Sequence, residues 1–113
     1  MKDLFKNIKK GTVTEEKDYI VWNLNNMVLR IFEDPYEYYV GCDIYRKIFR
    51  KEKLCNVTHL HLEKDEMETF VKEVDNPDKR IRIKKWGRFC AIDCSLDIVD
   101  KDDNKSGCYY SEI

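Results

Sequence analysis

The sequence predicts an α+β fold in one domain, residues 1–113, with a mostly antiparallel, meander-like sheet of about six to seven strands and one main helix. Three observations lead to this prediction. Apolar and polar residues alternate with a period of two in several segments, one segment near residues 64–75 has helical spacing, and short turn sequences separate the segments. We expect the main helix to pack on one face of the sheet.

The first third of the chain predicts a short helix and then a β-hairpin. Leu4, Phe5 and Ile8 are spaced like one face of a helix over residues 2–9, which Gly11 ends. The polar segment after Gly11 is expected to be a connector. The runs YIVWNL and MVLRIF are rich in β-branched and aromatic residues, and the NLNN segment at their junction suits a tight turn.

The middle of the chain predicts two further strands. Pro35 favours a turn, because it fixes its own φ and biases Asp34 away from the helical region. Beyond it, the alternation over residues 38–48 predicts a third strand, although a helix over residues 43–53 would also fit the apolar spacing. We favour the strand, and the run LCNVTHLHL predicts a fourth one.

The strongest helix signal is the segment EKDEMETFVKEV. Asp65 stands three residues before Glu68, a spacing typical of a capping box at the start of a helix. One apolar stripe follows at helical spacing and consists of Met67, Phe70, Val71 and Val74. The segment DNPDK ends this helix, because proline cannot continue it.

The last third of the chain predicts three more strands. The first is the short run RIRIKKW, and the second is the regular alternation over residues 90–99. The polar segment DKDDNKSG predicts a turn, after which CYYSEI can pair back as the final strand. The residues expected to face the core in the second strand are Cys90, Ile92, Cys94, Leu96 and Ile98.

Composition limits the classes of function. The formal net charge of −1 gives no global reason to expect nucleic acid or a membrane as a partner. The first residues are charged and lack the apolar core of a signal peptide, so we expect a cytoplasmic protein. Its five cysteines are expected to be thiols, since the cytosol is reducing.

The two histidines, His59 and His61, lie one residue apart and therefore on one face of the predicted fourth strand. Two imidazoles so placed can chelate Zn²⁺ or Fe²⁺, and Glu63 continues the same face, but a catalytic site needs at least a third ligand. These residues are weak metal-site candidates. We expect an exposed strand face and no cofactor.

A second weak signal is the basic segment over residues 79–88. Arg80, Arg82 and Lys84 share one face of a strand, with Trp86 beyond them. Basic residues interleaved with an aromatic ring can bind phosphates and stack a base. The alternative is an edge strand that its charges protect from aggregation, and we expect nucleic-acid binding to be unlikely at neutral net charge.

No motif assigns the chain to a known family or to an enzyme class, because it has no Gly-rich phosphate loop, no GxSxG and no HExxH. Its charges are segregated along the chain, which suits electrostatically steered docking to a protein partner. The leading hypothesis is a small protein-binding inhibitor, most concretely a bacterial toxin-neutralising immunity protein. The alternatives are metal binding at His59 and His61 and nucleic-acid binding at residues 79–88.

The candidate partner-binding residues are tyrosines and carboxylates, because tyrosine is enriched in interfaces. They are Glu33, Asp34, Tyr36, Glu37, Tyr39, Tyr45, Asp97, Asp100, Asp102 and Asp103.

Overall fold

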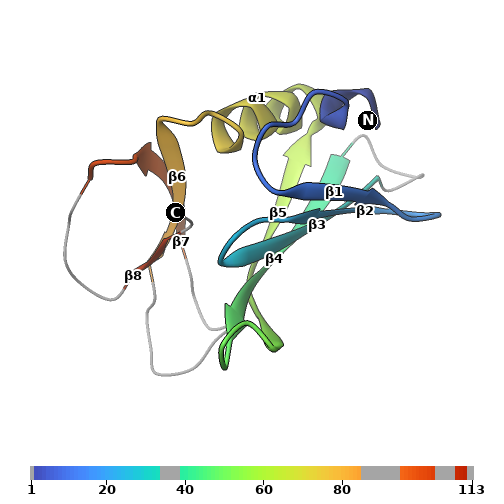
Figure 1. Ribbon diagram of the computed structural model, residues 1–113. Helices are drawn as coiled ribbons and strands as arrows, with labels where there is room; N and C mark the ends of the chain where they lie inside the picture. Colours follow the sequence, from blue (N-terminus) through green and yellow to red (C-terminus); the bar gives the residue numbers. More distant parts are fainter. Residues whose placement is uncertain (1, 34–38, 85–94, 104–108, 112–113) are drawn as a thin grey trace.

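The computed structural model describes residues 2–33, 39–84, 95–103 and 109–111 (Figure 1). Its strands form two antiparallel sheets, one of five strands in the order β1-β2-β3-β4-β5 and one of three in the order β7-β6-β8. The elements are η1 Lys2–Phe5, β1 Thr12–Glu15, β2 Ile20–Asn23, β3 Met27–Glu33, β4 Tyr39–Ile48, β5 Lys53–Glu63, α1 Lys64–Val74, β6 Lys79–Lys84, β7 Ser95–Asp100 and β8 Tyr109–Ser111.

The five-stranded sheet is the predicted meander, with each strand paired to its neighbour in sequence. The predicted hairpin is confirmed as β2 and β3. The N-terminal helix is present only as the 3₁₀ turn η1, and the expected connector contains strand β1. The sequence did not reveal β1 because the strand has four residues and only Val13 among them is partly buried.

The ambiguous segment over residues 43–53 is a strand and a turn, which confirms the favoured prediction. Strand β4 continues to Ile48, and β5 pairs with it from Lys53 to Glu63. A shift of register between Ile44 and Tyr45 marks a β-bulge, which increases the local twist of the pair. These two strands are the longest in the described chain and form one extended hairpin.

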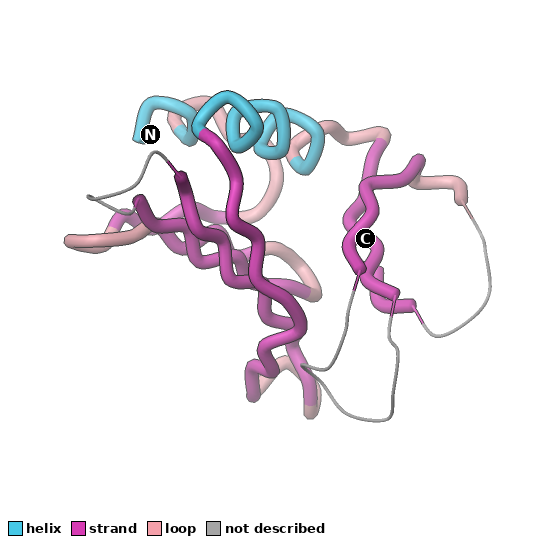
Figure 2. Tube along the Cα trace, turned by 180° about the vertical axis from the view of Figure 1, so that it is seen from behind, coloured by secondary structure: helices cyan, strands magenta, loops and turns pink. Residues whose placement is uncertain are grey.

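The last three strands form a second sheet instead of extending the first one. Helix α1 carries the chain away from β5, and β6 then pairs with β7 and β8 only. Ile81 and Ile83 of β6 point into the same core as the five-stranded sheet, so the two sheets pack through side chains and not through backbone hydrogen bonds. Seen from behind, α1 lies above the five-stranded sheet, and the loop that follows it leads to the second sheet at its side (Figure 2).

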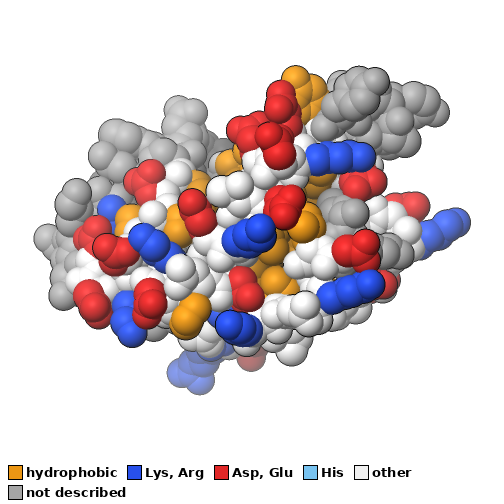
Figure 3. Space-filling model, turned by 90° about the horizontal axis from the view of Figure 1, so that it is seen from above, with side chains coloured by type: hydrophobic (Ala, Val, Ile, Leu, Met, Phe, Trp, Pro, Cys, Tyr) orange, Lys and Arg blue, Asp and Glu red, His pale blue; other side chains and the backbone are white. Residues whose placement is uncertain are grey.

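Helix α1 closes the core with the predicted stripe, since Met67, Phe70, Val71 and Val74 are all buried. Its capping box lies earlier than the sequence suggested, because the Glu66 carboxylate accepts a hydrogen bond of 3.0 Å from the backbone N–H of Glu63. The outer side of the helix is charged (Figure 3).

The C-terminal end of α1 holds the N-terminal segment in place. The carboxylate of Asp75 accepts hydrogen bonds from the backbone N–H groups of Lys9 and Lys10, at 2.9 Å each. The carbonyl oxygen of Lys10 in turn accepts a 2.9 Å hydrogen bond from Nε1 of the fully buried Trp22. The segment before β1 is therefore fixed to both the helix and the core.

The cysteines differ from the expected set of thiols. Cys42 is a buried free thiol of the core, but Cys55 is disulfide-bonded. Leu96 and Ile98 pack against the core as predicted, whereas the predictions for Cys90, Ile92 and Cys94 lie outside the described residues. In the described part of the chain, no helix has the length and apolar character that crossing a membrane requires.

Candidate docking face

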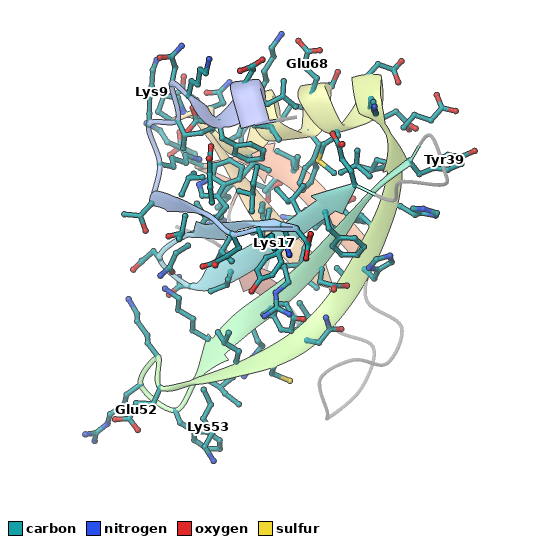
Figure 4. The ribbon with its side chains drawn as sticks, turned by 90° about the vertical axis from the view of Figure 1, so that its right-hand side faces the viewer. Lys9, Lys17, Tyr39, Glu52, Lys53 and Glu68 are labelled. Carbon is teal, nitrogen blue, oxygen red and sulfur yellow. The ribbon has the colours of Figure 1, made fainter. Side chains whose placement is uncertain are left out.

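The five-stranded sheet has one buried face and one open face. The core, α1 and the second sheet cover the inner face, whereas no described helix or strand crosses in front of the other (Figure 4). We call the following group of side chains the open face. Those that alternate outward along the strands are Arg30, Phe32, Tyr39, Asp43, Tyr45, His59 and His61, and Tyr19 joins them from just before β2 through its contact with Arg30.

Arg30 occupies the middle of the open face, between two tyrosine rings. The guanidinium carbon of Arg30 lies 5.2 Å from the ring centroid of Tyr19 and 5.4 Å from that of Tyr45. Both distances are within the range of a cation–π interaction. Among the described residues the guanidinium has no ion pair, so these ring contacts orient it while its N–H donors remain available to an incoming carboxylate or carbonyl group.

The two histidines lie at the edge strand of the open face, and each contacts a neighbour from another strand. Nδ1 of His59 lies 2.5 Å from Oδ1 of Asp43 on β4, and 48% of the His59 side chain is exposed. The ring centroids of His59 and His61 are 6.2 Å apart, and the ring of Tyr39 lies 4.8 Å from that of His61. The imidazoles thus belong to a continuous cluster of rings.

Gly41 shapes the part of the open face between Arg30 and the histidine rings. A Cβ atom at this position would lie 2.5 Å from ring carbons of Phe32, so only glycine lets that ring lie flat across β4. The Phe32 ring then reaches His59, with 6.0 Å between the ring centroids. Aromatic side chains therefore extend across β3, β4 and β5.

The geometry offers an incomplete metal site. Asp43 orients the His59 ring through Nδ1, as carboxylates commonly do for metal-bound histidines, and leaves Nε2 for a ligand. Glu63, the third candidate, lies where β5 ends and α1 begins. Over the described ranges, no three His, Cys, Asp or Glu residues are grouped so that they could hold a metal ion.

The predicted partner-binding residues separate into two regions. Tyr39 and Tyr45 lie on the open face, whereas Asp97 and Asp100 lie on β7 in the other sheet. The C-terminal carboxylates border a cleft of about 400 Å³, lined by Asp78, Asp100, Lys101, Asp102 and Asp103. Glu33 ends β3 beside a smaller cleft, and Asp34, Tyr36 and Glu37 lie outside the described residues.

The basic strand is occupied by contacts within the protein. Arg82 is buried, and its guanidinium lies 2.9 Å from a carboxylate oxygen of Asp103. Arg80 donates a hydrogen bond to the carbonyl oxygen of the same residue. A hydrogen bond from Lys79 to Asp100 raises the pKa of the Lys79 ammonium group. Trp86 lies outside the described residues. The described part of this segment is β6, which pairs with β7 on one side and β8 on the other, so the alternative of an edge strand was wrong.

Sequence reasoning missed three members of the open face, Tyr19, Arg30 and Phe32. The alternation of the predicted hairpin already placed them opposite the core residues Ile20, Leu29 and Ile31. No search by residue type would have joined them to the histidines, because that requires the register of β2 to β5.

No protein-family model, curated protein or solved structure matches this chain.

Proposed function

We propose that the protein binds a protein partner in a stoichiometric complex and that the open face is its docking surface. The supporting observation is the Tyr19–Arg30–Tyr45 stack, which lies on a sheet face that no described helix or strand covers. Tyrosine and arginine, together with tryptophan, are enriched among the residues that dominate binding energy. Because the stack holds Arg30 in place before binding, less side-chain entropy is lost when a partner engages it.

The chemistry of the face indicates how a partner would bind. The rings of Phe32, Tyr39, His59 and His61 provide apolar area with polar edges, and Arg30 provides a charged fork for a carboxylate or carbonyl group. A toxin-neutralising immunity protein is the concrete form of this proposal. In that case, adding the protein at equal molar amount to the toxin would block its activity.

Site-specific photocrosslinking tests the docking surface. A p-benzoylphenylalanine in place of Tyr39 on the open face should yield one dominant adduct in a lysate of the source organism. The same group in place of Glu68, on the outer side of α1, is the matched control and should not yield it. With the captured partner purified, Arg30→Ala should weaken binding by about 30-fold, as expected for a central interface arginine. Equal adducts from both positions would contradict the proposal.

Metal binding at His59 and His61 is the competing proposal, and the Asp43–His59 contact supports it. The two proposals make different predictions for zinc. If the face is a protein-docking surface, calorimetric titration with Zn²⁺ should give the same result for the wild-type protein and for His61→Ala. Zinc uptake that this substitution abolishes, together with loss of the photoadduct, would favour the metal site.

A cytoplasmic location is part of the docking proposal and has an observation against it. The disulfide at Cys55 is a feature that persists in oxidising compartments. Trapping thiols in intact cells before fractionation decides between the two locations. Recovery of Cys55 as a free thiol in the cytosolic fraction would support the cytoplasm.

A further inference from the structure

The hairpin formed by β4 and β5 extends beyond the rest of its sheet. Strand β3 pairs with β4 only as far as Arg46, whereas β4 and β5 remain paired to Ile48 and Lys53. Figure 4 labels Glu52 and Lys53 at the projecting end, opposite the end that carries Glu68 of α1. We call residues 46–54 the hairpin tip.

The hairpin tip exposes more apolar side chain than any other described part of the molecule. Phe49 is 68% exposed and Leu54 is 49% exposed, and Tyr39 of the open face is the third large hydrophobic residue with high exposure. Phe49 begins the turn, and Leu54 lies opposite Lys47 across the hairpin. Two apolar side chains at a projecting end can enter an apolar surface without displacing the fold.

Basic residues surround these two apolar side chains. They outnumber acidic ones five to one in the hairpin tip, with Arg46, Lys47, Arg50, Lys51 and Lys53 against Glu52. Two of the lysines are fixed by the β2–β3 turn, where Nζ of Lys47 donates to the Leu24 carbonyl and Nζ of Lys51 donates to Oδ1 of Asn25, each at 2.6 Å. These hydrogen bonds hold the ammonium groups of both lysines in defined positions.

The backbone of the hairpin tip adds an independent observation. Phe49, Arg50 and Lys51 have φ values of 51°, 59° and 71°, and none of them is glycine. The left-handed region is unfavourable for residues with a Cβ atom, and glycine is the usual residue there. A sequence selected only for folding would place glycine at these positions. Bulky and charged side chains held in this conformation indicate a role outside the fold.

The excess of positive charge in the hairpin tip has no counterpart at the other end of the molecule. Helix α1 has four acidic residues and two basic ones, but the lysines of the N-terminal segment beside it, among them Lys6 and Lys9, balance this difference. An anionic surface would therefore attract the hairpin tip more strongly than the helix end, even though the net charge of the chain is −1. The absence of a global charge signal in the sequence does not exclude such local attraction.

We propose that the hairpin tip is a peripheral contact site for anionic phospholipid membranes. Phe49 and Leu54 enter the interfacial layer, while Arg50, Lys51 and Lys53 contact lipid phosphates. A membrane fits better than nucleic acid for two reasons. Leu54 has no ring on which a base could stack, and a projecting tip reaches a flat surface more easily than it encloses a strand. This inference does not depend on the docking proposal.

Vesicle co-sedimentation of the full chain tests this site. Vesicles of phosphatidylcholine with about one third phosphatidylglycerol should retain the protein at low salt, and pure phosphatidylcholine vesicles should not. The double substitution Arg50→Gly and Lys51→Gly should reduce retention at least fivefold. Because glycine suits both backbone positions, this variant should also have a higher thermal midpoint, so loss of binding could not come from unfolding.

Two further variants complete the test. Lys9→Gln with Lys17→Gln removes two exposed charges away from the tip and should retain vesicle binding (Figure 4). Phe49→Trp should show a blue-shifted emission with anionic vesicles, which reports entry of the ring into the interface. No retention of the wild-type protein, equal loss in the lysine control, or preferential binding to a single-stranded DNA homopolymer would each overturn the proposal.

Discussion

The two faces of strand β4 follow different physical rules. Val40, Cys42 and Ile44 have almost no exposed surface and pack against α1 and the neighbouring strands, whereas Asp43 and Tyr45 alternate with them on the open face. Packing volume determines which residues can occupy the inner positions. The outer positions contribute little to folding, so their aromatic and charged side chains can serve binding. Substitutions of adjacent residues on opposite faces should reveal this difference.

The largest expected effect is on the inner face, at Leu29 of β3, which is fully buried. Leu29→Ala removes apolar area and leaves a cavity, so it should lower the free energy of unfolding by about 3 kcal/mol or more. Chemical denaturation followed by tryptophan fluorescence measures this change. A loss below about 1 kcal/mol would show that the inner face is not a packed core.

The next effect concerns the buried Cys42 thiol, whose pKa is raised far above its ordinary value of 9.0, first by burial and then by the charge of Asp43. Only in the unfolded chain does this thiol ionise readily. The contribution of the buried thiol to the free energy of unfolding is therefore fully present below pH 9.0 and is lost as the pH rises further. The free energy of unfolding should fall by about 1.4 kcal/mol per pH unit above that point.

Denaturation curves of the wild type and Cys42→Ala at several alkaline pH values isolate this contribution. The variant has lower stability because of its cavity, but its stability should depend less on pH. The Lys79–Asp100 contact, which weakens at still higher pH, is common to both proteins. Parallel pH profiles for the two proteins would contradict the assignment to Cys42.

The smallest effect on stability is expected next to Leu29 in sequence, at Arg30 on the open face. Arg30→Ala removes two exposed cation–π contacts, so the free energy of unfolding should fall by less than about 1 kcal/mol. The same denaturation assay measures it, and Leu29→Ala is the matched comparison. If Arg30→Ala were as destabilising as Leu29→Ala, the open face would be a structural element and its role in docking would need another explanation.

Local patterns were sufficient to predict the elements with strong periodicity. The alternation around Val40 and Ile44 predicted β4, and the stripe of Met67 and Phe70 predicted α1 together with the side of it that is buried. The second sheet could not be predicted. Whether β6 pairs with β5 or with β7 depends on the position at which α1 ends and β6 begins in the fold. Periodicity within a strand contains no information on that choice.

The candidate site was predictable only in part for the same reason. Tyr39, Tyr45 and the two histidines were identified by residue type. That they lie on the same face as Arg30 follows only from the register of the paired strands. The C-terminal aspartates were grouped with them because of charge, and the fold places them on a different sheet. For the segment over residues 43–53, which includes most of the hairpin tip, a strand was favoured over a helix, and its left-handed turn had no glycine to reveal it.

The hydrogen bonds to the Asp75 carboxylate have a consequence for folding during synthesis. The backbone N–H groups of Lys9 and Lys10 bind a carboxylate that lies 66 and 65 residues further along the chain. During synthesis, the segment before β1 can contact Trp22 early, but it lacks the Asp75 contact until α1 has left the ribosome. The last hydrogen bonds of this segment therefore form late in folding.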